Sequence, residues 1–124
     1  MIPSKNLLAV FALLIFICSM LGCMTEPDLS GYPVVSFNND VKLIIYTRCN
    51  QPGCHGPVDQ QQFSLQTYEE VLANVEPGNG RKSKLYRVIT GREEEFMPPS
   101  PNSALSEEDI RTIFVWIEQG APNN

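Results

Sequence analysis

Two cysteines and the only histidine of this chain stand together in the run Cys49-Asn50-Gln51-Pro52-Gly53-Cys54-His55. A cysteine pair followed directly by histidine is typical of covalent haem c attachment, in which each thiol forms a thioether to a haem vinyl group and the imidazole is the proximal iron ligand. The usual motif is C-x-x-C-H, so this spacer is longer. Pro52-Gly53 is a turn-forming pair that lets the extra residues loop out. The run therefore predicts one haem c, bound through Cys49 and Cys54 with His55 on the iron.

The amino terminus predicts export. Lys5 is followed by an apolar run over residues 7–20, and Met20-Leu21-Gly22-Cys23 looks like a lipoprotein cleavage site, where the cysteine is lipidated. We expect residues 1–22 to be a signal peptide, Cys23 to carry the lipid, and residues 23–35 to be a tether. Residues 36–124 would form one domain facing the periplasm or the cell surface of a bacterium. An uncleaved anchor helix over residues 7–24 is the alternative.

The charged residues of the chain argue against a nucleic-acid partner. The chain has 9 Lys and Arg against 14 Asp and Glu, a net charge of −5, which argues against nucleic acid because phosphate binding needs a basic face. It also has 10 prolines and 8 glycines, so its apolar core must be small. A cofactor that fills the centre of the domain would relieve that shortage.

Three other interpretations of the cysteine pair compete with haem. Cys18 and Cys23 belong to the leader and the anchor, which leaves Cys49 and Cys54 in the domain. A disulfide between them is plausible in an exported protein but gives His55 no role. A zinc ion would need a fourth ligand, and residues 36–124 hold no further cysteine or histidine. An inert pair of buried cysteines is the third alternative.

The remaining sequence predicts short helices and no convincing strand, so the fold class is all-α. The first helix starts near Phe37, with a cap among residues 38–40, and runs into Cys49. Thr67-Tyr68-Glu69-Glu70 is a capping box that opens a helix to about Ala73. Ser83 caps the next helix, which ends at Gly91.

The last helix has the clearest pattern. Ser106-Glu107-Glu108-Asp109 caps its start, and Gly120 and Pro122 end it. The apolar stripe that we expect to face the core consists of Ile110, Ile113, Phe114 and Ile117.

A second iron ligand follows by elimination. Met1 and Met20 go with the leader and Met24 lies beside the anchor, so Met97 is the methionine of the domain. The prolines after Met97 stiffen an extended loop that would present its sulfur. The alternatives are that Met97 fills the core or that the iron is five-coordinate.

The pocket around a haem would need apolar walls and cations for the propionates. Arg48 and Arg87 are candidates for pairing with the propionates. The candidate wall residues, each of which could equally be ordinary core, are Tyr46, Phe63, Tyr68, Tyr86, Phe96 and Trp116.

Several runs of residues add a family resemblance. They are CHGP at 54–57, FSL at 63–65, PGN at 77–79, SKLYRVITG at 83–91, MPP at 97–99, and LS through WIEQGAP over 105–122. From about residue 36 onward the chain resembles class I cytochromes c, and more closely the small cytochrome c domains of planctomycetes and Bacteroidetes. The resemblance implies three to five short helices around one covalent haem, with the first and last helices packed across each other. It also implies thioethers at Cys49 and Cys54, His55 as proximal ligand and Met97 as distal ligand.

These inferences predict a membrane-tethered monohaem cytochrome c that passes single electrons to redox partner proteins by outer-sphere transfer and is not an enzyme. Three alternatives stay open. The first is an accessory haem domain of a neighbouring redox enzyme. The second is a haem sensor or peroxidase-like protein with an open iron site. The third is a haem-free lipoprotein held by a Cys49–Cys54 disulfide.

Overall fold

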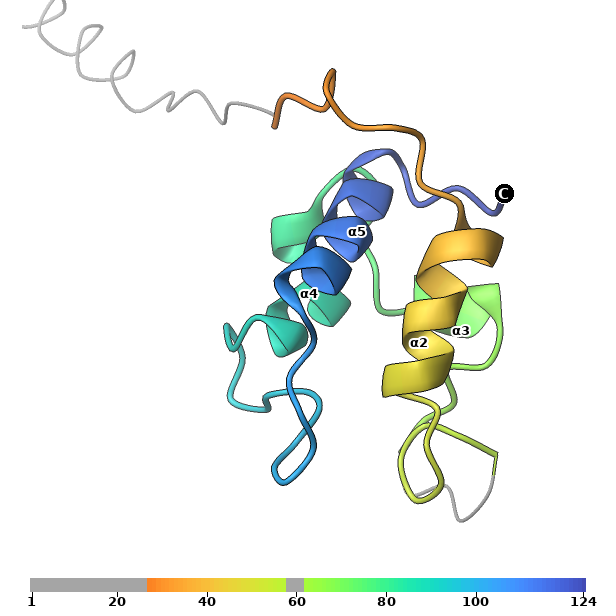
Figure 1. The fold of residues 1–124 in the computed structure, drawn as a ribbon, viewed down its shortest axis with the longest axis vertical. Coiled ribbons are helices and arrows are strands. Elements are labelled where there is room, and N and C mark those ends of the chain that lie inside the picture. The colour runs from red at the N-terminus through yellow and green to blue at the C-terminus, as the bar shows by residue number, and fades with distance from the viewer. Residues whose placement is uncertain (1–26, 58–61) are drawn as a thin grey trace, which may run out of the picture.

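A computed structural model describes residues 27–57 and 62–124, so the predicted signal peptide and the predicted lipid anchor Cys23 lie outside the described residues. All regular elements within these ranges are helical (Figure 1). They are η1 (Phe37–Val41), α2 (Lys42–Arg48), α3 (Tyr68–Leu72), η2 (Gly80–Lys82), α4 (Lys84–Ile89) and α5 (Glu107–Glu118). This confirms the predicted all-α class. None of the helices in the described ranges has the length and apolar content needed to cross a bilayer.

The first helix begins at Phe37, as predicted, but its N-cap lies before the residues 38–40 that were expected to cap it. Ser36 is the N-cap: its hydroxyl accepts a hydrogen bond from the Asn39 amide, and the Asp40 carboxylate accepts one from the Ser36 amide at 2.8 Å. The first turn is π-helical and continues into α2. The prediction that a residue from 38 to 40 caps the helix was therefore wrong, because Ser36 and Asp40 satisfy the free amides reciprocally.

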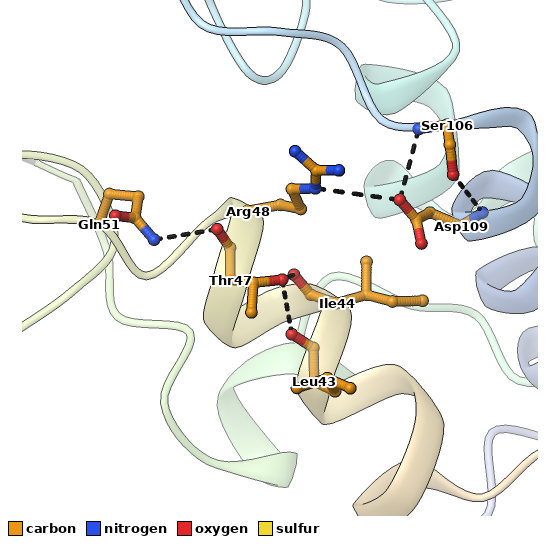
Figure 2. A network of polar contacts seen from close by, with 7 residues as sticks. All are labelled: Leu43, Ile44, Thr47, Arg48, Gln51, Ser106 and Asp109. Carbon is orange, nitrogen blue, oxygen red and sulfur yellow. Dashed lines mark hydrogen bonds and ion pairs between the residues drawn. The ribbon is translucent and has the colours of Figure 1, made fainter.

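The first and last helices lie side by side in antiparallel orientation (Figure 1). At one end Phe37 of η1 packs on Trp116 of α5, with ring centroids 5.6 Å apart. At the other end Arg48, the last residue of α2, approaches Asp109 in the first turn of α5, with Nε and Oδ2 separated by 3.9 Å (Figure 2). The pairing of the first and last helices therefore fixes the position at which the chain enters Cys49.

The carboxyl-terminal segment closes the core over this helix pair. The Trp116 indole donates to the Pro122 carbonyl at 3.0 Å, and the Tyr68 hydroxyl donates to the Ala121 carbonyl at 2.8 Å. The Phe37 amide donates to the Asn124 side chain at 2.8 Å. The buried apolar core is Val35, Phe37, Val41, Ile44, Ile45, Leu65, Val71, Leu85, Ile89, Leu105, Ile113, Val115, Trp116, Ile117 and Ala121.

The buried face of α5 differs from the predicted stripe. Ile113 and Ile117 are buried as expected, but Val115 and Trp116 are buried too. Phe114 is only partly buried and packs on Tyr86 of α4, with centroids 4.9 Å apart. The buried face is wider because η1 and the carboxyl-terminal segment cover α5 on the side opposite α4.

The start of α4 also departs from its predicted capping. Ser83 is the N-cap residue but its side chain makes no capping hydrogen bond. Its fully buried hydroxyl instead accepts from the Glu76 amide at 2.8 Å and donates to the Asn79 carbonyl at 2.9 Å. Ser83 therefore holds the turn that precedes α4 and fixes where this helix starts.

The Ser36 cap yields a first prediction. Ser36→Ala removes the acceptor for the Asn39 amide and the donor to the Asn124 carbonyl, which it contacts at 2.8 Å. We expect the free energy of unfolding to fall by about 1 kcal/mol, the usual effect of losing an N-cap serine. Urea titration followed by far-ultraviolet circular dichroism measures this loss. An unchanged midpoint would show that the cap does not stabilise the first helix.

Candidate functional site

A cavity of about 490 Å³ opens between the end of α2, the Cys49–His55 loop, α4 and the segment after Met97. This volume lies in the range of about 300–1,000 Å³ that small-molecule and cofactor pockets occupy. Four predicted site residues line it together: Cys49, Cys54, His55 and Met97. Residues that are distant in sequence therefore present two thiols, an imidazole and a thioether to one space.

The loop between the cysteines is a compact turn that folds back on the end of α2. The Cys54 amide donates to the Gln51 carbonyl at 3.0 Å, and Gly53 has a φ of +76°, which glycine adopts without strain. The His55 amide then donates to the Cys49 carbonyl at 3.2 Å. The longer spacer is thus absorbed in the turn, and both cysteines are free thiols at the cavity.

The His55 ring is oriented by one hydrogen bond. Its Nδ1 lies 2.6 Å from the Phe63 carbonyl oxygen, and the residue is only 8% exposed. A carbonyl can only accept, so Nδ1 carries a proton, and in the neutral imidazole the lone pair is therefore on Nε2. A backbone carbonyl that fixes the tautomer of an imidazole in this way is the usual support of a metal-binding histidine.

The segment that carries the Phe63 carbonyl is itself held by Glu70 of α3. The Glu70 carboxylate accepts hydrogen bonds from the Gln66 amide at 2.7 Å, the Thr67 amide at 2.9 Å and the Ser64 hydroxyl at 2.9 Å. Glu70 belongs to the predicted capping box with Thr67, which is confirmed. The cap of α3 therefore supports the histidine through the backbone of residues 63–66.

This cluster gives a pH-dependent prediction. The Thr67 amide and the Ser64 hydroxyl hold the pKa of Glu70 below its ordinary value of 4.5. A lowered folded-state pKa stabilises the fold above the unfolded-state pKa, and this contribution is lost as the pH falls through the folded-state pKa. We expect Glu70→Gln to lower the melting temperature at pH 7, and the difference from the wild type to shrink below pH 4.5. A difference that stays constant down to low pH would contradict ionic capping by Glu70.

Met97 reaches the cavity from the loop between α4 and α5. Its amide donates to the Val88 carbonyl at 3.0 Å, which ties the loop to the end of α4. Pro98 is buried, and both Pro98 and Pro99 line the cavity beside Met97. No helix forms at these prolines, as predicted, but the chain bends at residues 97 and 98 and turns at residues 100 and 101, so the segment is not the extended one expected.

Residues 52–101 match the family of planctomycete cytochrome c. This match supports a cytochrome c-like domain in the chain. The matched range contains Cys54, His55 and Met97 and begins just after Cys49. No curated protein matches this chain. No solved structure matches it either.

The walls of the cavity are mostly not the aromatic residues that the sequence indicated. Of these candidates only Phe63 lines the cavity, where its ring packs on His55 with centroids 4.7 Å apart. Tyr46 and Phe96 are 66% and 43% exposed, and the other three pack with residues outside the cavity. The aliphatic wall consists instead of Leu65, Leu85, Val88 and Ile89. Leu85 and Ile89 stand four residues apart, and this helical spacing of apolar residues is the sequence signal that could have identified the wall.

The two arginines considered for the haem propionates lie in different places. Arg48 lines the cavity, but its Nε faces Asp109 (Figure 2). Arg87 does not line it and forms an ion pair with Glu93. The prediction that Arg87 belongs to the pocket therefore finds no support in this geometry. Lys84, which was not considered, lines the cavity.

Burial controls the state of the Cys49 thiol. Burial, with a smaller contribution from the neighbouring Cys54, raises the pKa of Cys49 to about 11. The thiol is therefore protonated at neutral pH and is a weak nucleophile in this fold.

The residues present fit haem c. Two free thiols, an imidazole with an available Nε2 and a thioether sulfur line one cavity of suitable volume. Aliphatic side chains from α4 supply the apolar surroundings that a porphyrin needs. Cys49 and Cys54 are the residues that would hold its vinyl carbons, and His55 and Met97 are the residues that would ligate its iron.

Proposed function

We propose that this protein is a monohaem c-type cytochrome that carries single electrons between redox partner proteins by outer-sphere transfer. One observation carries the proposal: His55 and Met97 line the same cavity as both thiols. The haem supplies an iron that changes between ferric and ferrous states. Imidazole and thioether ligation raises the reduction potential relative to ligation by two imidazoles.

The protein's part in this function is to hold and shield the cofactor. The Phe63 carbonyl keeps the Nδ1 proton of His55, so Nε2 remains a neutral donor. The aliphatic wall of α4 limits water in the cavity, and a pocket shielded from water favours the less charged state of the iron. Met97 lines the cavity with His55, and a thioether on the iron would leave no open position for a substrate, which favours a carrier over an enzyme.

Carbon monoxide tests this function directly. A carrier with both axial positions filled binds carbon monoxide slowly or not at all when reduced, whereas an open iron site binds it at once. We expect no shift of the Soret band on adding carbon monoxide to the dithionite-reduced protein at neutral pH. An immediate shift would contradict the carrier and would support the haem sensor or peroxidase-like alternative.

We also infer that the domain is exported and anchored to a bacterial membrane by lipid on Cys23. The support is the charged, then apolar, amino terminus that ends in Leu21-Gly22-Cys23. Cys23→Ala should abolish incorporation of labelled palmitate and move the protein from the detergent phase to the aqueous phase. Cys18→Ala is the matched control and should change neither. Retention in the detergent phase without Cys23 would favour the uncleaved anchor helix.

A further inference from the structure

Among the residues that the structure describes, the charged side chains lining the cavity are those of Arg48, Lys84 and Glu95. Haem carries two propionates, and these lie on the porphyrin edge opposite its two vinyl groups. A carboxylate at the wall of a partly apolar pocket is stabilised by a cation within ion-pair distance. The position of each cation relative to the cysteines therefore indicates which of them faces the propionates.

Arg48 lies at the wrong edge for this role. It directly precedes Cys49, whose sulfur is the predicted attachment point for a vinyl group. Its Nε is also directed at the Asp109 carboxylate, 3.9 Å away, which joins α2 to α5 (Figure 2). Arg48 therefore belongs to the vinyl edge of the pocket and already has an anionic neighbour.

Lys84 reaches the cavity from α4. It is the first residue of α4, and the buried hydroxyl of Ser83 fixes the turn before it. Its Nζ lies 5.7 Å from the centroid of the Phe63 ring, which in turn packs on His55. Within residues 27–57 and 62–124, no carboxylate lies within ion-pair distance of this ammonium group. Lys84 is thus the cavity cation that has an aromatic neighbour but no anionic partner in the described part of the chain.

We propose that the Lys84 ammonium binds a haem propionate. The proposal rests on the proposed function, because it needs haem in the cavity. It adds a residue of α4 to the cofactor contacts made by the cysteine loop and the Met97 loop. The contact would give the first residue of α4 an anionic partner in the haem-loaded protein.

Three variants test the contact in the haem-loaded protein. Lys84→Gln removes the cation, Lys84→Arg keeps it, and Lys82→Gln is the matched control because Lys82 is an exposed lysine of η2 outside the cavity lining. The first readout is the propionate bending mode in the resonance Raman spectrum. The second is the midpoint potential, which falls when a cation beside the haem is removed.

We expect Lys84→Gln to shift the propionate mode and lower the potential, with Lys84→Arg restoring the wild-type mode and Lys82→Gln leaving it unchanged. A propionate mode that stays unchanged in Lys84→Gln, with normal haem content, would overturn the Lys84 contact and leave the cytochrome intact. A wild-type protein without covalent haem would instead overturn the proposed function itself. Haem content measured on every variant separates the two failures.

Discussion

Replacing Met97 with alanine is expected to convert a six-coordinate low-spin haem into a high-spin haem with an open position. Met97 and His55 line the same cavity but come from different segments of the chain. Replacing Met97 leaves no thioether among the described lining residues. The midpoint potential should fall by a sizeable part of the range of about 0.8 V that axial ligands set. The reduced variant should also bind carbon monoxide. Visible and magnetic circular dichroism spectra measure the change of spin state.

The matched control for this experiment is Phe96→Ala. Phe96 is the neighbour of Met97, is 43% exposed and does not line the cavity. Its replacement should leave the spectrum and the potential at wild-type values. If Met97→Ala and Phe96→Ala both kept the low-spin spectrum, the sixth ligand would not be Met97.

Replacing Gly56 with alanine is expected to disrupt the cysteine loop. A Cβ atom at this position would lie 2.6 Å from the carbonyl oxygen of Asn50 and 3.0 Å from that of Gln51. Both are backbone atoms of the turn that carries the two cysteines, so neither can move without moving the turn. Overpacking of this kind costs about 1–3 kcal/mol of folding free energy. We therefore expect a lower melting temperature and a lower yield of haem-loaded protein.

Gly31→Ala is the matched control for the Gly56 variant. Gly31 lies before the first helix, and a Cβ atom there meets nothing within 4 Å. This variant should keep the wild-type melting temperature and haem yield. Equal behaviour of the two variants would show that the close approach at Gly56 does not limit folding of the loop.

The parts of this fold that could be predicted from sequence are those set by short-range patterns. The capping boxes at Thr67 and Ser106 were found because a cap and its partner stand three residues apart. The four candidate site residues that line the cavity were indicated because Cys49, Cys54 and His55 form one run and Met97 precedes two prolines. Such signals need no knowledge of how distant segments meet.

The parts that could not be predicted depend on contacts between distant segments. Nothing local to Phe63 indicates that its carbonyl, rather than its ring alone, would orient His55. The candidate aromatic walls were mostly wrong because an aromatic residue on a helix can face the helix pair as easily as the cavity. Trp116 does so, packing on Phe37 instead of the cavity. Lys84 was missed because a lysine at the start of a helix is ordinarily a surface residue.

A pyridine haemochrome spectrum tests directly whether haem is bound covalently to Cys49 and Cys54. The protein would be exported together with haem c maturation factors and extracted with acidified acetone before the measurement. The account predicts that the haem stays on the chain and shows the α-band of a haem with two thioethers. Cys49→Ala and Cys54→Ala should each shift this band to that of a haem with one thioether. Haem that extracts completely from the wild-type protein would contradict the account and favour the disulfide-bonded lipoprotein.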